Sequence, residues 1–266
     1  MSYQQIDSHY QIKKDKIFFS DRRLDAFYED VYSVFRLFDA VDGSYTPPAC
    51  VEELARARER IELLKKLRIK VDDCCHKAFA VRYALALIEQ ETLVCPTAEE
   101  LKNYSEMIGH KMCREAELKN DVLIYETEAF LFQVRSNMDM IVQLLKHVYG
   151  YFDEKKGRDC ESFKTREGDK LNTVDLMRVN GDTDMANFFQ KQVDEWFTEL
   201  NKMRNMIAHR SGLTEFKSVV FKSETEEVVK PKMPNEKNVD EYCRDIFRRL
   251  MEIYKTVAVE FVLPKL

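Results

Sequence analysis

The residues best suited to chemistry lie close together near the C-terminal third of the chain. Arg204, Asn205 and His209 stand within one short segment, and Asn201 precedes them by about one helical turn. If this segment is helical, Asn201, Asn205 and His209 recur at every fourth position and share one face, which Arg204 borders. That face would present one imidazole, one guanidinium and two amides.

Such a set of side chains suits the cleavage of an RNA phosphodiester by its own 2′-hydroxyl, a reaction that requires no metal. A histidine with a pKa near neutrality can accept or donate a proton, and an arginine can donate two hydrogen bonds to phosphate oxygens as charge builds in the transition state. A helix C-terminus favours the imidazolium. The alternative is that His209 and Arg210 only cap a helix, with Arg204 solvated.

The segment Arg204-Asn205-Met206-Ile207-Ala208-His209 resembles the Arg-polar-x-x-x-His motif of the HEPN superfamily, all-α domains that are common among prokaryotic ribonuclease toxins and phage-defence proteins. The resemblance covers roughly residues 97 to 266. It implies that Arg204 and His209 are the catalytic pair and that Asn205 positions them. It also implies a homodimer whose two motifs form one RNA-cleaving site, and, for a toxin, an antitoxin protein as a partner.

A local excess of positive charge accompanies the motif. From Asn201 to Lys222 there are five Lys and Arg residues against the single acid Glu215, although the whole chain has a net charge of -5. An RNA site on this acidic protein must therefore be local. We expect Asn201, Lys202 and Arg210 to contribute to RNA binding.

A second polar cluster precedes Gly150 and consists of Arg135, Ser136, Asp139, Gln143 and His147. The family likeness places its helix beside the motif helix, so that Asp139 or Ser136 would hydrogen-bond Arg204 or His209 in a supporting role. Arg135 and Asp139 are also an i, i+4 pair. The alternative is a structural salt bridge between them, with a solvated His147.

Composition argues against cofactors, secretion and membrane spanning. The seven cysteines are scattered without a C-x-x-C spacing and indicate reduced, mostly buried thiols in the cytosol. His76 beside Cys74 and Cys75, and His110 near Cys113, lack the ligand count of a zinc site. No signal-peptide pattern or long apolar run is present. We therefore predict a cytoplasmic protein with no metal and no other cofactor.

Hydrophobic periodicity and the low Gly and Pro content predict an all-α fold, a bundle of long helices with a small β-hairpin before the C-terminal helix. Residues 1–95 would form an N-terminal helical region packed onto a HEPN-like domain at residues 96–266, and residues 1–20 an arm or docking strand. The expected helices span residues 21–41, 50–91 (one helix, or two joined near 71–73), 97–119, 120–150, 184–209 and 238–262. A loop is expected at 153–183, with a short helix at 174–179 inside it. The hairpin is expected around 223–226.

Three capping predictions follow from the boundaries of these helices. Thr97 to Glu100 forms a capping box, Asp182 or Thr183 caps the helix that carries the motif, and Asn238 caps the last helix. Gly212 ends the motif helix.

Two other functional classes stay open. A catalytically inactive HEPN-like module that binds nucleotide or RNA, or serves as a dimerising scaffold, is favoured by the acidic net charge. A helical adaptor would dock a partner through the Glu/Arg-rich segment from Val51 to Lys70. An RNA substrate would be single-stranded or looped, because its exposed backbone must reach the two catalytic side chains.

Overall fold

The computed structural model describes residues 30–37, 51–93, 115–118, 121–152, 163, 172–210, 219–222, 227–229 and 231–266. It divides into two compact units. Unit 1 comprises Met1–Phe27, Val81–Leu131 and Arg204–Phe247, and unit 2 comprises Tyr28–Ala80, Phe132–Met203 and Arg248–Leu266. The long helices contribute residues to both units.

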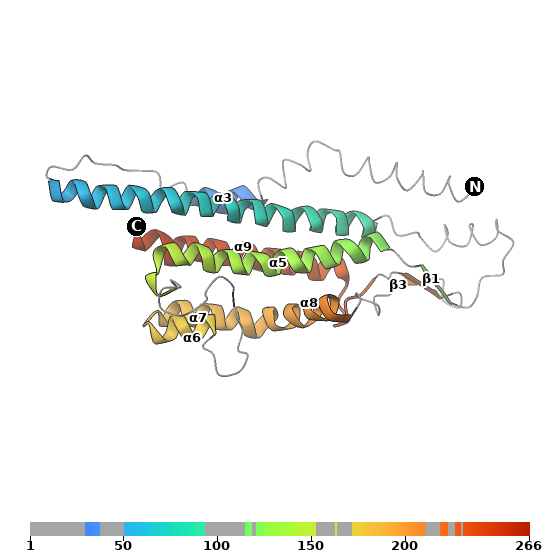
Figure 1. Cartoon of the computed structure of the whole chain (residues 1–266). Coiled ribbons are helices and arrows are strands. Elements are labelled where there is room, and N and C mark those ends of the chain that lie inside the picture. The colour runs from blue at the N-terminus through green and yellow to red at the C-terminus, as the bar shows by residue number, and fades with distance from the viewer. Residues whose placement is uncertain are drawn as a thin grey trace. The chain divides into compact units, whose positions relative to one another are not determined.

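Helices predominate in the part of the chain that the structure describes, as the sequence predicts (Figure 1). Residues 30–37 are helical. The main helices are α3 (Val51–Leu93), α5 (Asp121–Val148), α6 (Thr173–Val179), α7 (Thr183–Gln192), α8 (Thr198–Arg210) and α9 (Val239–Thr256). Short 3-10 turns at Gly150–Phe152 (η2) and Leu263–Lys265 (η6) and π-turns at Val193–Phe197 (η4) and Val257–Val262 (η5) accompany them.

Several predicted boundaries agree with the structure. The segment 50–91 forms one uninterrupted helix, α3, rather than two. The helix predicted to end near Gly150 ends at Val148. The short helix predicted at 174–179 is α6, and Asn172 caps its N-terminus by accepting a 2.7 Å hydrogen bond from the Asp175 N–H. The arm at residues 1–20, most of the helix predicted at 21–41, and the capping box at 97–100 lie outside the described residues.

One predicted helix is partly wrong. Residues 97–119 were expected to be helical, but Glu115–Leu118 forms strand β1, which pairs antiparallel with β2 (Val219–Lys222) in the register Glu115↔Lys222 to Leu118↔Val219. Strand β2 in turn pairs antiparallel with β3 (Glu227–Val229), at the place of the predicted hairpin. The segment Glu-Ala-Glu-Leu favours helix by propensity, and its pairing with residues about a hundred positions away overrides that preference.

The core of unit 2 contains the apolar stripe predicted on α5. Val134, Met138, Ile141 and Leu145 are all fully buried. A chain of hydrogen bonds fixes three helices around this stripe: the Tyr254 hydroxyl of α9 donates to Asn137 Oδ1 of α5 over 2.8 Å, and Asn137 Nδ2 donates to the Lys77 carbonyl of α3 over 3.1 Å. Because Tyr254 and Asn137 are buried, each would lose a partner at considerable cost if the helices shifted.

The helix that carries the motif is not a uniform α-helix. The π-turn η4 separates α7 from α8, and the Thr198 hydroxyl donates to the Val193 carbonyl five residues earlier over 2.8 Å. Within unit 2, Arg249 of α9 holds this turn through a 2.9 Å ion pair with Glu195. Asp182 does precede α7, but its side chain makes no capping bond, so that part of the capping prediction is wrong. Its backbone ψ of 61° lies outside the extended conformation that N-cap residues usually adopt.

Candidate functional site

The polar and apolar faces of α8 are segregated as the sequence predicts. Leu200, Met203 and Ile207 are buried, at 0%, 4% and 9% exposure. Lys202 and Asn205 are exposed, and Asn201 is half-buried. The apolar positions anchor the helix, and Asn205 lies on its exposed side, which half-buried Arg204 borders.

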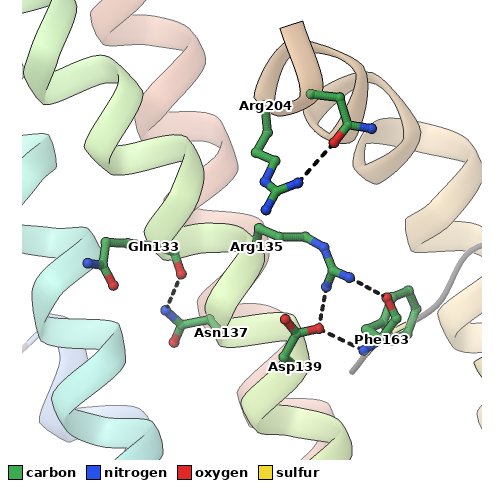
Figure 2. A network of polar contacts seen from close by, with 7 residues as sticks. Gln133, Arg135, Asn137, Asp139, Phe163 and Arg204 are labelled. Atoms are coloured by element: carbon green, nitrogen blue, oxygen red, sulfur yellow. Dashed lines mark hydrogen bonds and ion pairs between the residues drawn. The ribbon is translucent and has the colours of Figure 1, made fainter. Parts of the chain in front are cut away.

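Arg204 and Asn205 are directly linked. One terminal nitrogen of the Arg204 guanidinium donates to Asn205 Oδ1 over 3.0 Å, the bond marked by the dashed line at Arg204 in Figure 2. Arg204 is half-buried and Asn205 is exposed. A guanidinium is planar and carries five donors in a fixed geometry, so a single bond of this kind restricts the orientation of the whole group.

His209 and Arg210 belong to the last turn of α8, but their side chains lie outside the described residues. The helical backbone continues through both of them, so His209 follows Asn205 by four residues in an unbroken helix. The structure therefore confirms the helical spacing of the motif.

Asp139 and Arg135 hold a loop in unit 2. They form an ion pair, the Phe163 N–H donates to the same Asp139 carboxylate oxygen over 2.7 Å, and Arg135 donates to the Phe163 carbonyl over 2.7 Å (Figure 2). Both backbone polar groups of a fully buried residue are thereby satisfied. The structural salt bridge between Arg135 and Asp139 is confirmed, whereas a bond from Asp139 or half-buried Ser136 to the motif stays a prediction.

The contacts around Phe163 were not predicted from the sequence. Its ring lies edge-on to Phe197 with the centroids 5.1 Å apart, and Arg135 lies over the Phe197 ring at 5.4 Å. The i, i+4 spacing of Arg135 and Asp139 indicated an ion pair but not its third partner. The one signal in the sequence was that Phe163 is the only aromatic residue of the polar 153–183 segment.

His147 is half-buried, so its side chain is only partly solvated. Burial lowers the pKa of His147, and the positive charges of Lys70, Lys66 and Lys146 lower it further. The imidazole is therefore held in its neutral form near neutral pH. Gln143, one turn earlier, accepts a 3.3 Å hydrogen bond from Lys70.

The cysteines that the structure describes are unsuited to nucleophilic chemistry. Cys74, Cys75 and Cys243 are free thiols and are buried. Burial raises the pKa of Cys74 to about 12 and that of Cys75 to about 11. Since the thiolate is the reactive form, these residues act as small core side chains, as predicted for them.

The described residues contain neither a candidate metal site nor a candidate membrane span. No three His, Cys, Asp or Glu residues among them gather in a way that could hold a metal ion. Their helices include none with the length and apolar character needed to cross a membrane.

Comparisons with known proteins returned no family model, no curated protein and no solved structure that matches this chain. The resemblance to the HEPN superfamily therefore depends on the motif and its helical setting.

Proposed function

We propose that this chain is a metal-independent endoribonuclease of the HEPN type. The observation that carries the proposal is the hydrogen bond from half-buried Arg204 to exposed Asn205 on α8. This bond orients a cation without neutralising it, because an amide oxygen carries no net charge. An oriented guanidinium suits the recognition of a phosphodiester.

In the proposed reaction the 2′-oxygen of the RNA attacks the adjacent phosphorus, a new O2′–P bond forms and the P–O5′ bond breaks. The 2′-hydroxyl proton passes to one imidazole, and the departing 5′-oxygen receives a proton from an imidazolium. His209 supplies these groups, one from each copy in a homodimer. Arg204 donates to the non-bridging oxygens as their charge increases. The products are a 2′,3′-cyclic phosphate and a 5′-hydroxyl.

The setting of the motif favours this proposal over a coincidental match. The motif lies in the last turns of a helix, β2 and β3 follow it, and α9 comes after them, the order expected of a helical bundle with a hairpin insertion. A cytoplasmic toxin or phage-defence effector, controlled by an antitoxin, is the corresponding biological role. Lys202 is exposed on α8 and would contact the RNA backbone, together with Asn201 and Arg210.

The test compares RNA cleavage by the wild type, Arg204→Ala and His209→Ala in the presence of EDTA. We expect each variant to lose at least about a hundredfold in rate, the magnitude typical of a lost general acid-base or transition-state donor. His76→Ala and Arg248→Ala are matched controls, since both side chains are exposed and belong to helices α3 and α9 rather than to α8. RNA with 2′-O-methyl groups should resist cleavage, and circular dichroism should show that every variant is folded.

Equal cleavage by the wild type and both motif variants would contradict the proposal. A wild type that forms a dimer but cleaves no RNA would instead support the inactive scaffold, which the acidic net charge of -5 favours. A strictly monomeric chain that still cleaves RNA would refute the shared site while retaining the catalytic pair.

A further inference from the structure

Helices α3 and α5 lie side by side and antiparallel, and three contacts within unit 2 define their register (Figure 1). Asn137 Nδ2 reaches the Lys77 carbonyl over 3.1 Å, and the Cys74 thiol lies 3.8 Å from the Met140 carbonyl. Lys70 Nζ reaches Gln143 Oε1 over 3.3 Å. Each step of about one turn back along α3 matches a step of about one turn forward along α5.

Continuing this register by one more turn pairs Lys66 with His147. The electrostatic influences on the imidazole agree with that placement, because they come from Lys70 and Lys66 of α3 and from Lys146 of α5. Lys70 also forms a 2.9 Å ion pair with Asp73. Lys66 is exposed, and Lys70, Lys146 and His147 are half-buried, so solvent reaches the whole cluster.

We infer that Lys66, Lys70, Lys146 and His147 form a phosphate-binding surface for the backbone of a single-stranded nucleic acid. The inference rests on the proposed function for the identity of that strand as RNA. Lysine ammonium groups bind phosphates as point charges. Lys66 and Lys70 are one helical turn apart, about 6 Å along the helix axis, which is close to the separation of consecutive phosphates on an extended strand.

Binding would change the protonation of His147. In the protein alone, burial and three neighbouring ammonium groups disfavour the imidazolium. A bound phosphate brings negative charge to the same cluster and opposes the effect of the lysines, so the pKa of His147 rises in the complex. By linkage, the strand binds more tightly as the pH falls through the pKa that His147 has in the complex.

The test uses the full chain and a short oligodeoxythymidylate, which has the same phosphates but no 2′-hydroxyl and so cannot be cleaved by the proposed route. Fluorescence anisotropy gives the affinity at several salt concentrations, and histidine NMR follows the titration of His147. We expect the double variant Lys66→Ala/Lys146→Ala to bind roughly two- to thirtyfold more weakly. The slope of log K against log salt should fall by about 1.4 for the two lost cations. Lys191→Ala, an exposed lysine paired with Glu195, is the matched control.

A His147 titration that moves to higher pH with the oligonucleotide, together with weaker binding by the double variant alone, supports the surface. An unchanged His147 titration, no binding by the wild type, or equal binding by the double variant and the control overturns it. The two proposals fail separately. Binding that depends on these lysines without RNA cleavage would refute only the nuclease, and cleavage with lysine-independent binding would refute only this surface.

Discussion

Replacing Asp139 with alanine should loosen the loop that contains Phe163. The substitution removes the acceptor of two hydrogen bonds, one from the Arg135 guanidinium and one from the Phe163 N–H. It also leaves Arg135 as a cation whose side chain is only 19% exposed. The ring contact between Phe163 and Phe197 depends on the same anchor.

The magnitude follows from the burial of the partners. A hydrogen bond to a charged group contributes about 1.5–3 kcal/mol, and two are lost here. The Asp139 side chain is 28% exposed, so water can replace part of the lost interaction. We therefore expect the free energy of unfolding to fall by about 2–4 kcal/mol, below the sum for two fully buried bonds. For a chain of this size that corresponds to a decrease in Tm of about 5–15 °C.

Thermal and urea unfolding can be followed at Trp196, the single tryptophan, whose ring lies 5.5 Å from that of Phe197. Asp194→Ala is the matched control, because it removes an exposed acceptor of one 2.9 Å bond from Gln190 and should cost less than about 0.5 kcal/mol. Adding Arg135→Met to Asp139→Ala should recover part of the loss, since it removes the uncompensated cation. A loss for Asp139→Ala no greater than for the control would refute the reasoning.

Three further predictions concern other parts of the molecule. Tyr254→Phe leaves a buried amide oxygen without its donor and should lower the free energy of urea unfolding by about 1–3 kcal/mol, whereas Tyr83→Phe on the exposed face of α3 should not. Because the pKa of His147 is lowered in the folded state, the unfolded state binds more protons as the pH falls below 6.5, so the free energy of unfolding decreases there. His147→Gln should make the urea midpoints at pH 7.5 and pH 5 more nearly equal. A variant whose midpoint changes as much as that of the wild type would contradict this prediction. Asn205→Asp should reduce RNA cleavage more than Asn205→Ala, because a carboxylate neutralises Arg204; the reverse order in steady-state rates would count against an electrostatic role.

Hydrophobic periodicity predicted the parts of the fold in which the buried side chains follow the spacing of a single helix. The apolar stripe of α8 and that of α5 follow directly from side chains that recur at helical spacing, and both are buried. The same reasoning placed Asn201, Asn205 and His209 at consecutive turns of α8. Their arrangement needs no information about the rest of the chain.

Features that depend on distant partners escaped the same reasoning. Strand β1 exists because Glu115–Leu118 pairs with Val219–Lys222, and no pattern within the four residues of β1 reports that pairing. The loop anchor at Phe163 likewise requires Asp139 from a helix that precedes it. The π-turn η4 was also missed, because the sequence around Val193 and Thr198, which its i, i+5 bond joins, does not differ in pattern from that of an ordinary α-helix.

The chemistry of the candidate site can be argued from one neutral residue. Adjacent positions on a helix are about 100° apart, so the bond between Arg204 and Asn205 links the guanidinium of a half-buried residue to a side chain on the exposed face of α8. An acidic residue at position 205 would orient Arg204 equally well but would neutralise the charge that phosphate recognition requires. An apolar residue would retain the charge but would remove this bond. Asparagine satisfies both requirements, which gives a physical reason for a polar, uncharged residue beside the arginine of this motif.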